Sequence, residues 1–298
     1  MSSGGAAIAV ISDGKMGHLN QSLGLAEAIL RLRPQLRVEE LRAMPRWKAW
    51  HAWLSAKRPP THYKLVIAAG HRTHWTALAL RRSVACPLIV LMRPSLPRSL
   101  FDLCIQPRHD GGQESDRLWL SEGALNRMQP AVDRGDAGLI LIGGPSPHYR
   151  WDDQAVIGQL TQICDGSRAW QLSTSRRTPR GFAAALAELR LPGLRIHEAA
   201  DLPPGWLAAE LPKAEATWVT PDSASMVYEA LTAGSQVGVF TLPAKAKSRV
   251  ASAMLDLQTR GLITGFPDFE REGGLRATDV VLAEADRFAQ RLVERGWV

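Results

Sequence analysis

Short apolar runs of strand length alternate with helical patterns along almost the whole chain. In the first half, the strand-sized run Ile8–Ile11 precedes a helical pattern at Leu19–Leu32, and Leu65–Ala69 precedes another at Thr73–Arg82. The other strands predicted in this half are Leu36–Leu41, Leu88–Leu91 and Leu103–Ile105. Repeated strand–helix units predict an α/β fold in which a parallel sheet carries helices on both faces.

The alternation restarts after Gln129–Ala137, whose proline, glycine and mixed charges are typical of a linker. The elements predicted beyond it are strands Leu139–Ile142, Trp170–Leu172, Leu194–Ile196, Ala216–Val219 and Val237–Phe240, and helices Asp153–Cys164, Gly181–Leu189, Ser223–Thr232 and Ala277–Arg295. We therefore predict two Rossmann-like domains, residues 1–130 and 137–298, with the last helix free to pack back on the first domain. Ligands are expected at the carboxyl ends of the strands and in the crevice between the domains.

Four loops that follow predicted strands have residues suited to phosphate binding. Each combines small or hydroxylated residues with the start of a helical pattern, where free N–H groups and the positive end of the helix dipole attract an oxyanion. The loops are Ile11–His18, Ile142–Ser146, Ser173–Arg177 and Thr220–Ser225. Their distribution over both halves indicates a cleft for a phosphorylated ligand.

The last of these loops has the most specific pattern. Thr220 is expected to cap the helix with Pro221 at its first position, which leaves the Ser223 and Ser225 hydroxyls for phosphate oxygens. Glu229, two turns into the helix, would accept hydrogen bonds from the vicinal hydroxyls of a sugar. The alternative is an ordinary capped helix with a solvated Glu229.

Two other pairs of residues point to the same ligand. Arg176 and Arg177 lie in a hydroxyl-rich loop and suit bidentate phosphate recognition. Gly143 and Gly144 permit a ligand to approach the backbone closely, although a glycine pair after a strand is also an ordinary turn.

Positive charge is concentrated in the first half. Between Arg31 and Leu100 there are fourteen Lys or Arg residues against only Glu39 and Glu40, whereas the rest of the chain is mildly acidic. This asymmetry indicates an anionic surface or polymer that meets one half only.

Within that half, Trp47, Trp50 and Trp53 recur every three residues and would form an aromatic stripe on a helix. The cations near the stripe are Arg42, Arg46, Lys48, Lys57 and Arg58. This composition is typical of a helix at an anionic bilayer interface. The alternatives are tryptophans in the core with solvated cations, or single-stranded nucleic acid; without a nucleic-acid module in the sequence, we expect no nucleic-acid partner.

The remaining features of the sequence limit the classes of protein to which the chain can belong. No apolar run approaches the ~20 residues of a membrane-spanning helix, and no basic region of a secretory signal precedes the first strand. Cys86, Cys104 and Cys164 match no metal-ligand spacing. We expect a reduced, cytoplasmic protein without a metal site.

The motifs together resemble the family named after the plant mitochondrial-fission, or elongated-mitochondria, protein. The matching segments are Ser12–Lys15 with Gly17, Asn20 and Gln21; Phe101–Leu103 with Pro107, His109 and Asp110; Ile142–Ser146 with His148 and Tyr149; Ser175–Pro179; and Thr220 with Asp222, Ser223, Ser225, Met226, Glu229 and Ala230. Many bacterial members are described as glycosyltransferases of the GT-B fold. The chain departs at Gly234-Ser235-Gln236-Val237, where the family usually has Gly-Lys-Pro-Val. If the family lysine holds the donor, this change, including Gln236, puts donor strength or identity in question.

The resemblance implies a nucleotide-sugar donor in the C-terminal domain and an acceptor in the N-terminal one. The residues predicted to contact the donor are Lys15, Gly143, Gly144, Ser146, Arg176, Arg177, Asp222, Ser223, Ser225 and Glu229. Arginines and a helix dipole would stabilise the leaving diphosphate, so neither a divalent metal nor a separate cofactor is expected. The candidate general base is His18, with Asp13 and Asp110 as alternatives.

The basic, tryptophan-rich segment would then dock the enzyme peripherally on the cytoplasmic membrane face. There it would reach a lipid-linked or anionic acceptor, such as an envelope glycolipid or lipopolysaccharide. A non-catalytic membrane adaptor on the same scaffold is the competing function. A dinucleotide-dependent epimerase or reductase fits poorly, because no G-x-G-x-x-G follows the first strand.

Overall fold

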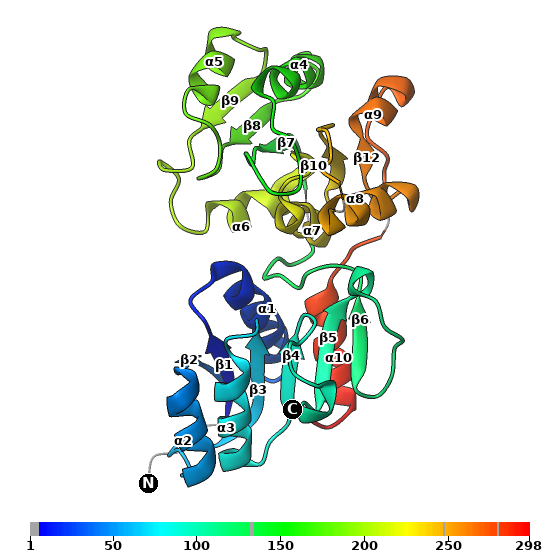
Figure 1. Ribbon diagram of the computed structural model, residues 1–298. Coiled ribbons are helices and arrows are strands. Elements are labelled where there is room, and N and C mark those ends of the chain that lie inside the picture. The colour runs from blue at the N-terminus through cyan, green and yellow to red at the C-terminus, as the bar shows by residue number, and fades with distance from the viewer. Residues whose placement is uncertain (1–5, 132–133, 247, 279) are drawn as a thin grey trace. The chain divides into compact units, whose positions relative to one another are not determined.

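The computed structural model describes residues 6–131, 134–246, 248–278 and 280–298 (Figure 1). The chain forms two compact units, residues 1–127 with 283–298, and residues 128–282. Each unit is built on a sheet of six described, parallel strands. The predicted α/β architecture of two Rossmann-like domains is therefore confirmed.

The first sheet has the strand order β2-β1-β3-β4-β5-β6. Its strands are β1 (Ala7–Ser12), β2 (Arg37–Arg42), β3 (Tyr63–Ala69), β4 (Leu88–Leu91), β5 (Leu103–Pro107) and β6 (Leu118–Ser121). Its helices are α1 (Met16–Leu32), α2 (Arg46–Ser55), α3 (His74–Val84) and α10 (Glu284–Glu294), with short 3-10 turns η1 (Arg98–Leu100) and η2 (Arg108–Asp110). The sequence prediction lacked β6.

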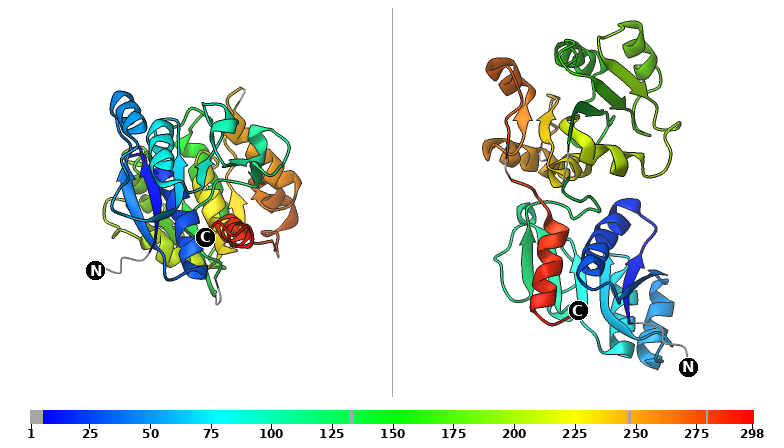
Figure 2. Two further views of the ribbon diagram at one scale, coloured as in Figure 1. Left: turned by 90° about the horizontal axis from the view of Figure 1, so that it is seen from below. Right: turned by 180° about the vertical axis from the view of Figure 1, so that it is seen from behind.

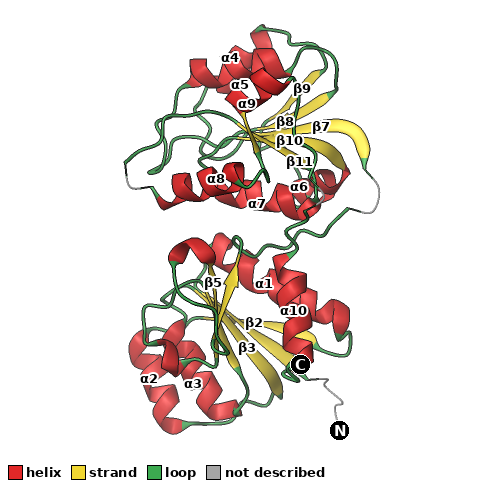
Figure 3. Ribbon diagram, turned by 90° about the vertical axis from the view of Figure 1, so that its right-hand side faces the viewer, coloured by secondary structure: helices red, strands yellow, loops and turns green. Residues whose placement is uncertain are grey.

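Strand β1 is buried on both faces of this sheet. Ile8 and Val10 pack in a core cluster with α1 and α10, whereas Ala7, Ala9 and Ile11 belong to the cluster on the α3 side. Figure 3 shows α2 and α3 on one face of the sheet and α1 and α10 on the other. Since alternate residues of a strand point to opposite faces, a continuous apolar run is what this arrangement requires.

The last helix, α10, belongs to the first unit, where it packs beside α1 (Figure 2). Phe288 stacks on Trp119 of β6 with 5.8 Å between ring centroids. The helix begins at Glu284, seven residues later than predicted. Leu282, shortly before the helix, is bound to α7 instead, because its N–H donates to the Leu231 carbonyl and its carbonyl accepts the Thr232 hydroxyl.

The second sheet has the strand order β12-β11-β10-β7-β8-β9. Its strands are β7 (Gly135–Leu141), β8 (Trp170–Ser173), β9 (Leu194–His197), β10 (Ala214–Val219), β11 (Gln236–Val239) and β12 (Thr264–Gly265). The helices are α4 (Asp153–Ile163), α5 (Phe182–Glu188), α6 (Trp206–Glu210), α7 (Ala224–Ala233), α8 (Arg249–Thr259) and α9 (Phe266–Glu272), with the turn η3 (Leu211–Lys213). Fully buried Trp218 of β10 packs against the rings of Phe240, Phe266 and Phe269.

Part of the predicted linker is a strand. β7 begins at Gly135, so residues 135–137 pair in the sheet, and residues 132 and 133 lie outside the described part of the chain. Among the described residues, no helix combines the length and apolar character that crossing a membrane requires.

Candidate functional site

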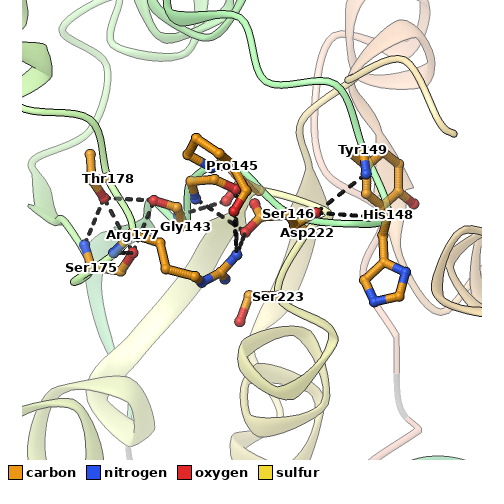
Figure 4. Close-up of polar contacts among 12 residues, drawn as sticks. Gly143, Pro145, Ser146, His148, Tyr149, Ser175, Arg177, Thr178, Asp222 and Ser223 are labelled. Atoms are coloured by element: carbon orange, nitrogen blue, oxygen red, sulfur yellow. Dashed lines mark hydrogen bonds and ion pairs between the residues drawn. The ribbon is translucent and has the colours of Figure 1, made fainter.

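Three loops of the second unit meet because β10, β7 and β8 are neighbours in the sheet. All three strands are parallel, so their carboxyl ends share one edge. Figure 4 shows the loops after β7, β8 and β10 converging there, connected by hydrogen bonds and an ion pair. The sequence therefore placed three of its four candidate loops correctly on carboxyl strand ends of this sheet.

The glycine pair serves contacts within the protein. The Gly143 N–H donates to Thr220 Oγ1 over 2.7 Å, and the Gly144 N–H donates to Asp222 Oδ2 over 3.1 Å. A Cβ on Gly143 would collide with the Asp222 carboxylate, and a Cβ on Gly144 would collide with the Arg177 carbonyl. Both N–H groups predicted to face a phosphate are thus already bonded, and the missing side chains let the three loops pack together.

Thr220 is not the helix cap predicted from the sequence. Helix α7 begins at Ala224, with Ser223 at the N-cap position, and Pro221 lies in the turn before it. The Thr220 side chain is fully buried and its hydroxyl accepts the Gly143 N–H. A contact between loops far apart in sequence has replaced the local capping bond.

Arg177 and Asp222 form an ion pair between the loops after β8 and β10, in which only Asp222 is buried. Arg177 Nη1 lies 2.7 Å from Asp222 Oδ2; the Asp222 side chain is 0% exposed and that of Arg177 is 43% exposed. Arg177 also donates weakly to the carbonyls of Gly144 and Pro145, at 3.4 and 3.5 Å. Asp222 Oδ1 is buried and has no hydrogen-bond partner among the described residues.

Arg176 differs from its neighbour. Its side chain is exposed, and it has no ion pair or hydrogen bond with any described residue. The sequence treated the two arginines as equivalent, but the structure engages Arg177 internally and leaves the Arg176 guanidinium open to a ligand.

The loop after β8 is held to the glycine loop by hydroxyls. Ser175 Oγ donates to the Gly143 carbonyl over 2.9 Å, and Thr178 Oγ1 donates to the same oxygen over 2.6 Å. Ser146 Oγ accepts the N–H groups of His148 and Tyr149, so it stabilises its own loop. Lys245 Nζ donates to the Ser146 carbonyl over 2.7 Å.

The N-terminus of α7 remains open. The hydroxyls of Ser223 and Ser225 lie 3.3 Å apart, and Ser223 makes no capping bond. Figure 4 shows Ser223 at the start of this helix. Farther along the helix, burial raises the pKa of Glu229 to about 7, and its carboxylate has no hydrogen bond to a described residue.

Gln236 lies away from these loops. It is the first residue of β11 and pairs with Ala216, whereas the loop-bearing carboxyl end of β10 pairs with Val239. Three residues of strand place Gln236 about 10 Å from that edge. The departure from the family motif at Ser235 and Gln236 therefore falls at the amino end of the sheet.

In the first unit, Asp13 and His18 form a hydrogen-bonded pair at the carboxyl end of β1. His18 Nδ1 lies 3.1 Å from Asp13 Oδ2; the Asp13 side chain is 0% exposed and that of His18 is 22% exposed. Burial alone would raise the pKa of Asp13, but hydrogen bonds from the Lys15 N–H and His18, and the charges of these residues, lower it overall. With Nδ1 held by Asp13, Nε2 makes no hydrogen bond to a described residue.

Gly70, at the end of β3, makes room for this pair. Its φ is +85°, and a Cβ at this position would collide with the His18 imidazole and lie 3.2 Å from Asp13 Oδ2. The sequence prediction missed this residue, although Gly70 repeats the signal that marked the other loops, a small residue between a predicted strand and the start of a helical pattern.

The first loop does not offer its helix end to a phosphate as predicted. Asp13 Oδ1 accepts the Lys15 N–H at the start of α1, so a carboxylate already occupies the anion position. Lys15 itself is exposed. Asp110 lies in η2 after β5, and β5 is three strands from β1, so roughly 14 Å of sheet separates it from the pair.

The tryptophan helix has a different exposed stripe from the predicted one. Trp47, Trp50 and Leu54 are 63%, 48% and 55% exposed. Trp53 instead stacks on Trp50 with 5.4 Å between centroids, and the Arg82 guanidinium covers it at 4.4 Å. The exposed apolar stripe of α2 therefore follows the spacing i, i+3, i+7.

Solved structures share the fold at low sequence identity. MurG from Acinetobacter baumannii matches with a TM-score of 0.53 and 12% identity over 98% of this chain and 92% of that one. UGT89C1 from Arabidopsis thaliana, solved with UDP, matches with a TM-score of 0.51 and 11% identity over 97% and 94%. A Listeria monocytogenes protein described as a UDP-N-acetylglucosamine 2-epimerase matches with a TM-score of 0.55 and 12% identity over 97% and 88%. These likenesses establish the GT-B fold.

No curated protein matches the chain in sequence. The profile of one family, described as mitochondrial fission ELM1, matches residues 16–296. Of the segments that resemble this family, all but Ser12–Lys15 lie within that range. The chain therefore belongs to the mitochondrial fission ELM1 family.

Proposed function

We propose that the protein is a GT-B glycosyltransferase, with a nucleotide-sugar donor in the second unit and the acceptor in the first. The family and the fold support the class of enzyme. The observation that carries the proposal is the Asp13–His18 pair, because a buried carboxylate that holds one imidazole nitrogen is how enzymes orient a histidine base.

In the proposed reaction, His18 Nε2 takes the proton of an acceptor hydroxyl. That oxygen forms a bond to the anomeric carbon of the donor, and the bond from this carbon to the diphosphate breaks, its electron pair leaving with the nucleotide. Asp13 stabilises the imidazolium that forms and keeps Nε2 as the accepting atom. Asp110, another candidate base, follows β5, which lies three strands from the Asp13–His18 pair.

For the donor, we assign the diphosphate to Arg176, the Ser223 and Ser225 hydroxyls and the N-terminus of α7. An exposed guanidinium and an open helix end neutralise the leaving group without a metal. Glu229 would accept hydrogen bonds from the ribose, which would supply partners that its buried carboxylate lacks. Arg177, Asp222, Gly143, Gly144 and Ser146 shape the loops, since their polar groups are bonded to one another.

The exposed stripe of α2 supports a membrane-associated acceptor. Trp47, Trp50 and Leu54 lie on one face, and Lys48 lies over the Trp47 ring at 5.2 Å. Aromatic residues with cations favour an anionic bilayer interface. We propose that this face docks on a membrane carrying an envelope glycolipid or a lipopolysaccharide-type acceptor. The same exposed stripe also supports the alternative function, a membrane adaptor without catalysis.

Nucleotide binding separates the two functions. UDP, GDP, CMP and their sugar conjugates should be screened by thermal shift with the wild type, Arg176→Ala and Arg180→Ala. Arg180 is an exposed arginine of the same loop and serves as the matched control. A stabilising nucleotide should lose roughly tenfold in affinity in Arg176→Ala and keep it in Arg180→Ala. If no nucleotide stabilises the wild type while anionic vesicles bind it, the adaptor function is favoured.

A further inference from the structure

The first unit contains a cavity of about 840 Å³ at the carboxyl ends of β1, β2, β3 and β4. Its lining includes Asp13 after β1, Arg42 and Arg46 around the end of β2, Arg72 after β3, and Ser95 after β4. The volume is in the range of small-molecule sites, which is roughly 300–1,000 Å³. The cavity therefore lies at the edge where a fold of this class binds ligands, beside the Asp13–His18 pair.

The arginines of this cavity have no counter-charge. Among the described residues, Arg42, Arg46 and Arg72 have no ion-pair partner, and Arg46 only lies over the Trp75 ring at 5.9 Å. Arginines elsewhere in the same unit do pair with carboxylates, as Arg81 does with Asp102 at 2.6 Å and Arg127 with Glu27 at 2.6 Å.

Asp13 does not neutralise the three arginines. Of the described residues that line the cavity, it is the only Asp or Glu, and its oxygens are engaged by His18 and the Lys15 N–H. His71 also lines the cavity and is exposed. Three guanidinium groups around one hollow repel one another unless an anion enters, and their planar donors match the oxygens of phosphate or carboxylate.

We infer that this cavity binds an oxyanionic group of the acceptor, and so selects a phosphorylated or carboxylated sugar. That the bound molecule is the acceptor rests on the proposed function. That the cavity binds an oxyanion does not depend on it. Met44, Leu96 and Trp75 also line the cavity and supply apolar surface for the sugar. An anion fixed by Arg42 and Arg72 would hold a neighbouring hydroxyl of the same molecule near His18.

The inference is tested by isothermal titration of the full chain with inorganic pyrophosphate, glucose 6-phosphate, glucuronate and glucose. Every protein in this experiment carries the substitution Arg176→Ala, so that the second unit contributes little to oxyanion binding. Arg42→Ala and Arg72→Ala are compared with Arg33→Ala. Arg33 follows the C-terminus of α1, at the opposite edge of the sheet, so this control removes the same charge away from the cavity.

The expected result is binding of the oxyanionic probes and not of glucose, weakened about tenfold by either cavity substitution and unchanged by Arg33→Ala. Because the cavity opens to solvent, added salt should also weaken binding. Equal affinity in all the variants, or binding of glucose as tight as that of its phosphate, would overturn the inference.

Two further comparisons identify the source of the anion. A short-chain phosphatidic acid that binds more tightly than glucose 6-phosphate, with the same loss in Arg72→Ala, assigns the oxyanion to a lipid headgroup; the reverse order assigns it to a soluble sugar. Nucleotide binding by Arg42→Ala and Arg72→Ala with Arg176 intact is measured in parallel. If the proposed transferase function is wrong, these proteins should bind no nucleotide, whatever the titrations with the oxyanionic probes show.

Discussion

Arg177 Nη1 lies 2.7 Å from Asp222 Oδ2, and this ion pair joins the loop after β8 to the loop after β10. Because the Asp222 side chain is fully buried, Arg177 compensates a charge that water cannot reach. Its neighbour Arg176 is exposed and makes no such contact. The two adjacent arginines therefore differ: Arg177 is engaged within the protein, whereas Arg176 is the one that we propose binds a ligand.

We predict that Arg177→Ala lowers the free energy of unfolding by about 2 kcal/mol, less than for a fully buried pair because Arg177 is 43% exposed. Arg176→Ala should change it by less than about 0.5 kcal/mol. Denaturant unfolding followed by tryptophan fluorescence measures both. The double variant Arg177→Ala/Asp222→Asn should recover part of the loss; no recovery would mean that the buried charge is not its cause.

Asp13→Asn should reduce the rate of sugar transfer by about 10²–10⁴, while donor affinity stays unchanged. The amide can no longer stabilise the imidazolium or select its tautomer. His18→Ala should cost a similar factor, and the double variant little more, because the two side chains act as one unit. Steady-state rates of Asp110→Asn provide the comparison, and a larger loss there than in Asp13→Asn would transfer the role of base to Asp110.

Gly70→Ala should displace His18 from Asp13. Both Gly70 and Gly14 have positive φ, +85° and +83°, but only at Gly70 would a Cβ collide with the imidazole, whereas none is within 4 Å at Gly14. Gly14→Ala therefore isolates the backbone cost, about 1 kcal/mol, and Gly70→Ala should exceed it by roughly 1–3 kcal/mol. The His18 imidazole resonances report the displacement by NMR. Equal stability losses in the two variants would contradict the steric account.

His74 should make stability fall as the pH drops below about 6.5. Burial first, and then the nearby His71, lower the pKa of His74 to about 4, while the unfolded chain keeps its ordinary value of 6.5. Between these values the unfolded state binds a proton that the folded state refuses, so the free energy of unfolding decreases by an amount on the order of 3 kcal/mol from pH 7 to pH 4. Urea unfolding across this range gives the free energy of unfolding as a function of pH. This free energy should change less steeply with pH in His74→Gln than in His51→Gln, which alters an exposed histidine on α2. Identical slopes would exclude His74 as the source.

The sequence predicted the central strands of both sheets well, because these strands are apolar on both faces. Leu88–Leu91 forms β4 within the predicted bounds, since every residue of the run is buried. It predicted Thr220 as a helix cap wrongly, because the hydroxyl is taken by Gly143, 77 residues away. It could not separate Arg176 from Arg177, because the buried Asp222, in the loop after β10, pairs with Arg177 alone.

The candidate base could be predicted only in part. Asp13 and His18 are five residues apart, so both were visible as one loop. Their pairing depends on the empty space at Gly70, which the fold brings in from β3. Local patterns thus locate the loops, and contacts between distant strands decide which groups remain free for chemistry.

Transfer of a labelled sugar tests the central claim most directly. The nucleotide-sugar identified by binding should be incubated with a cell-envelope extract and with wild type or His18→Ala, and the label followed into the acceptor fraction. We predict incorporation with the wild type and a loss of at least about a hundredfold with His18→Ala, which still binds the donor. Equal labelling by both proteins, or an isomerised nucleotide-sugar formed without any acceptor, would contradict the assignment as a glycosyltransferase that uses His18.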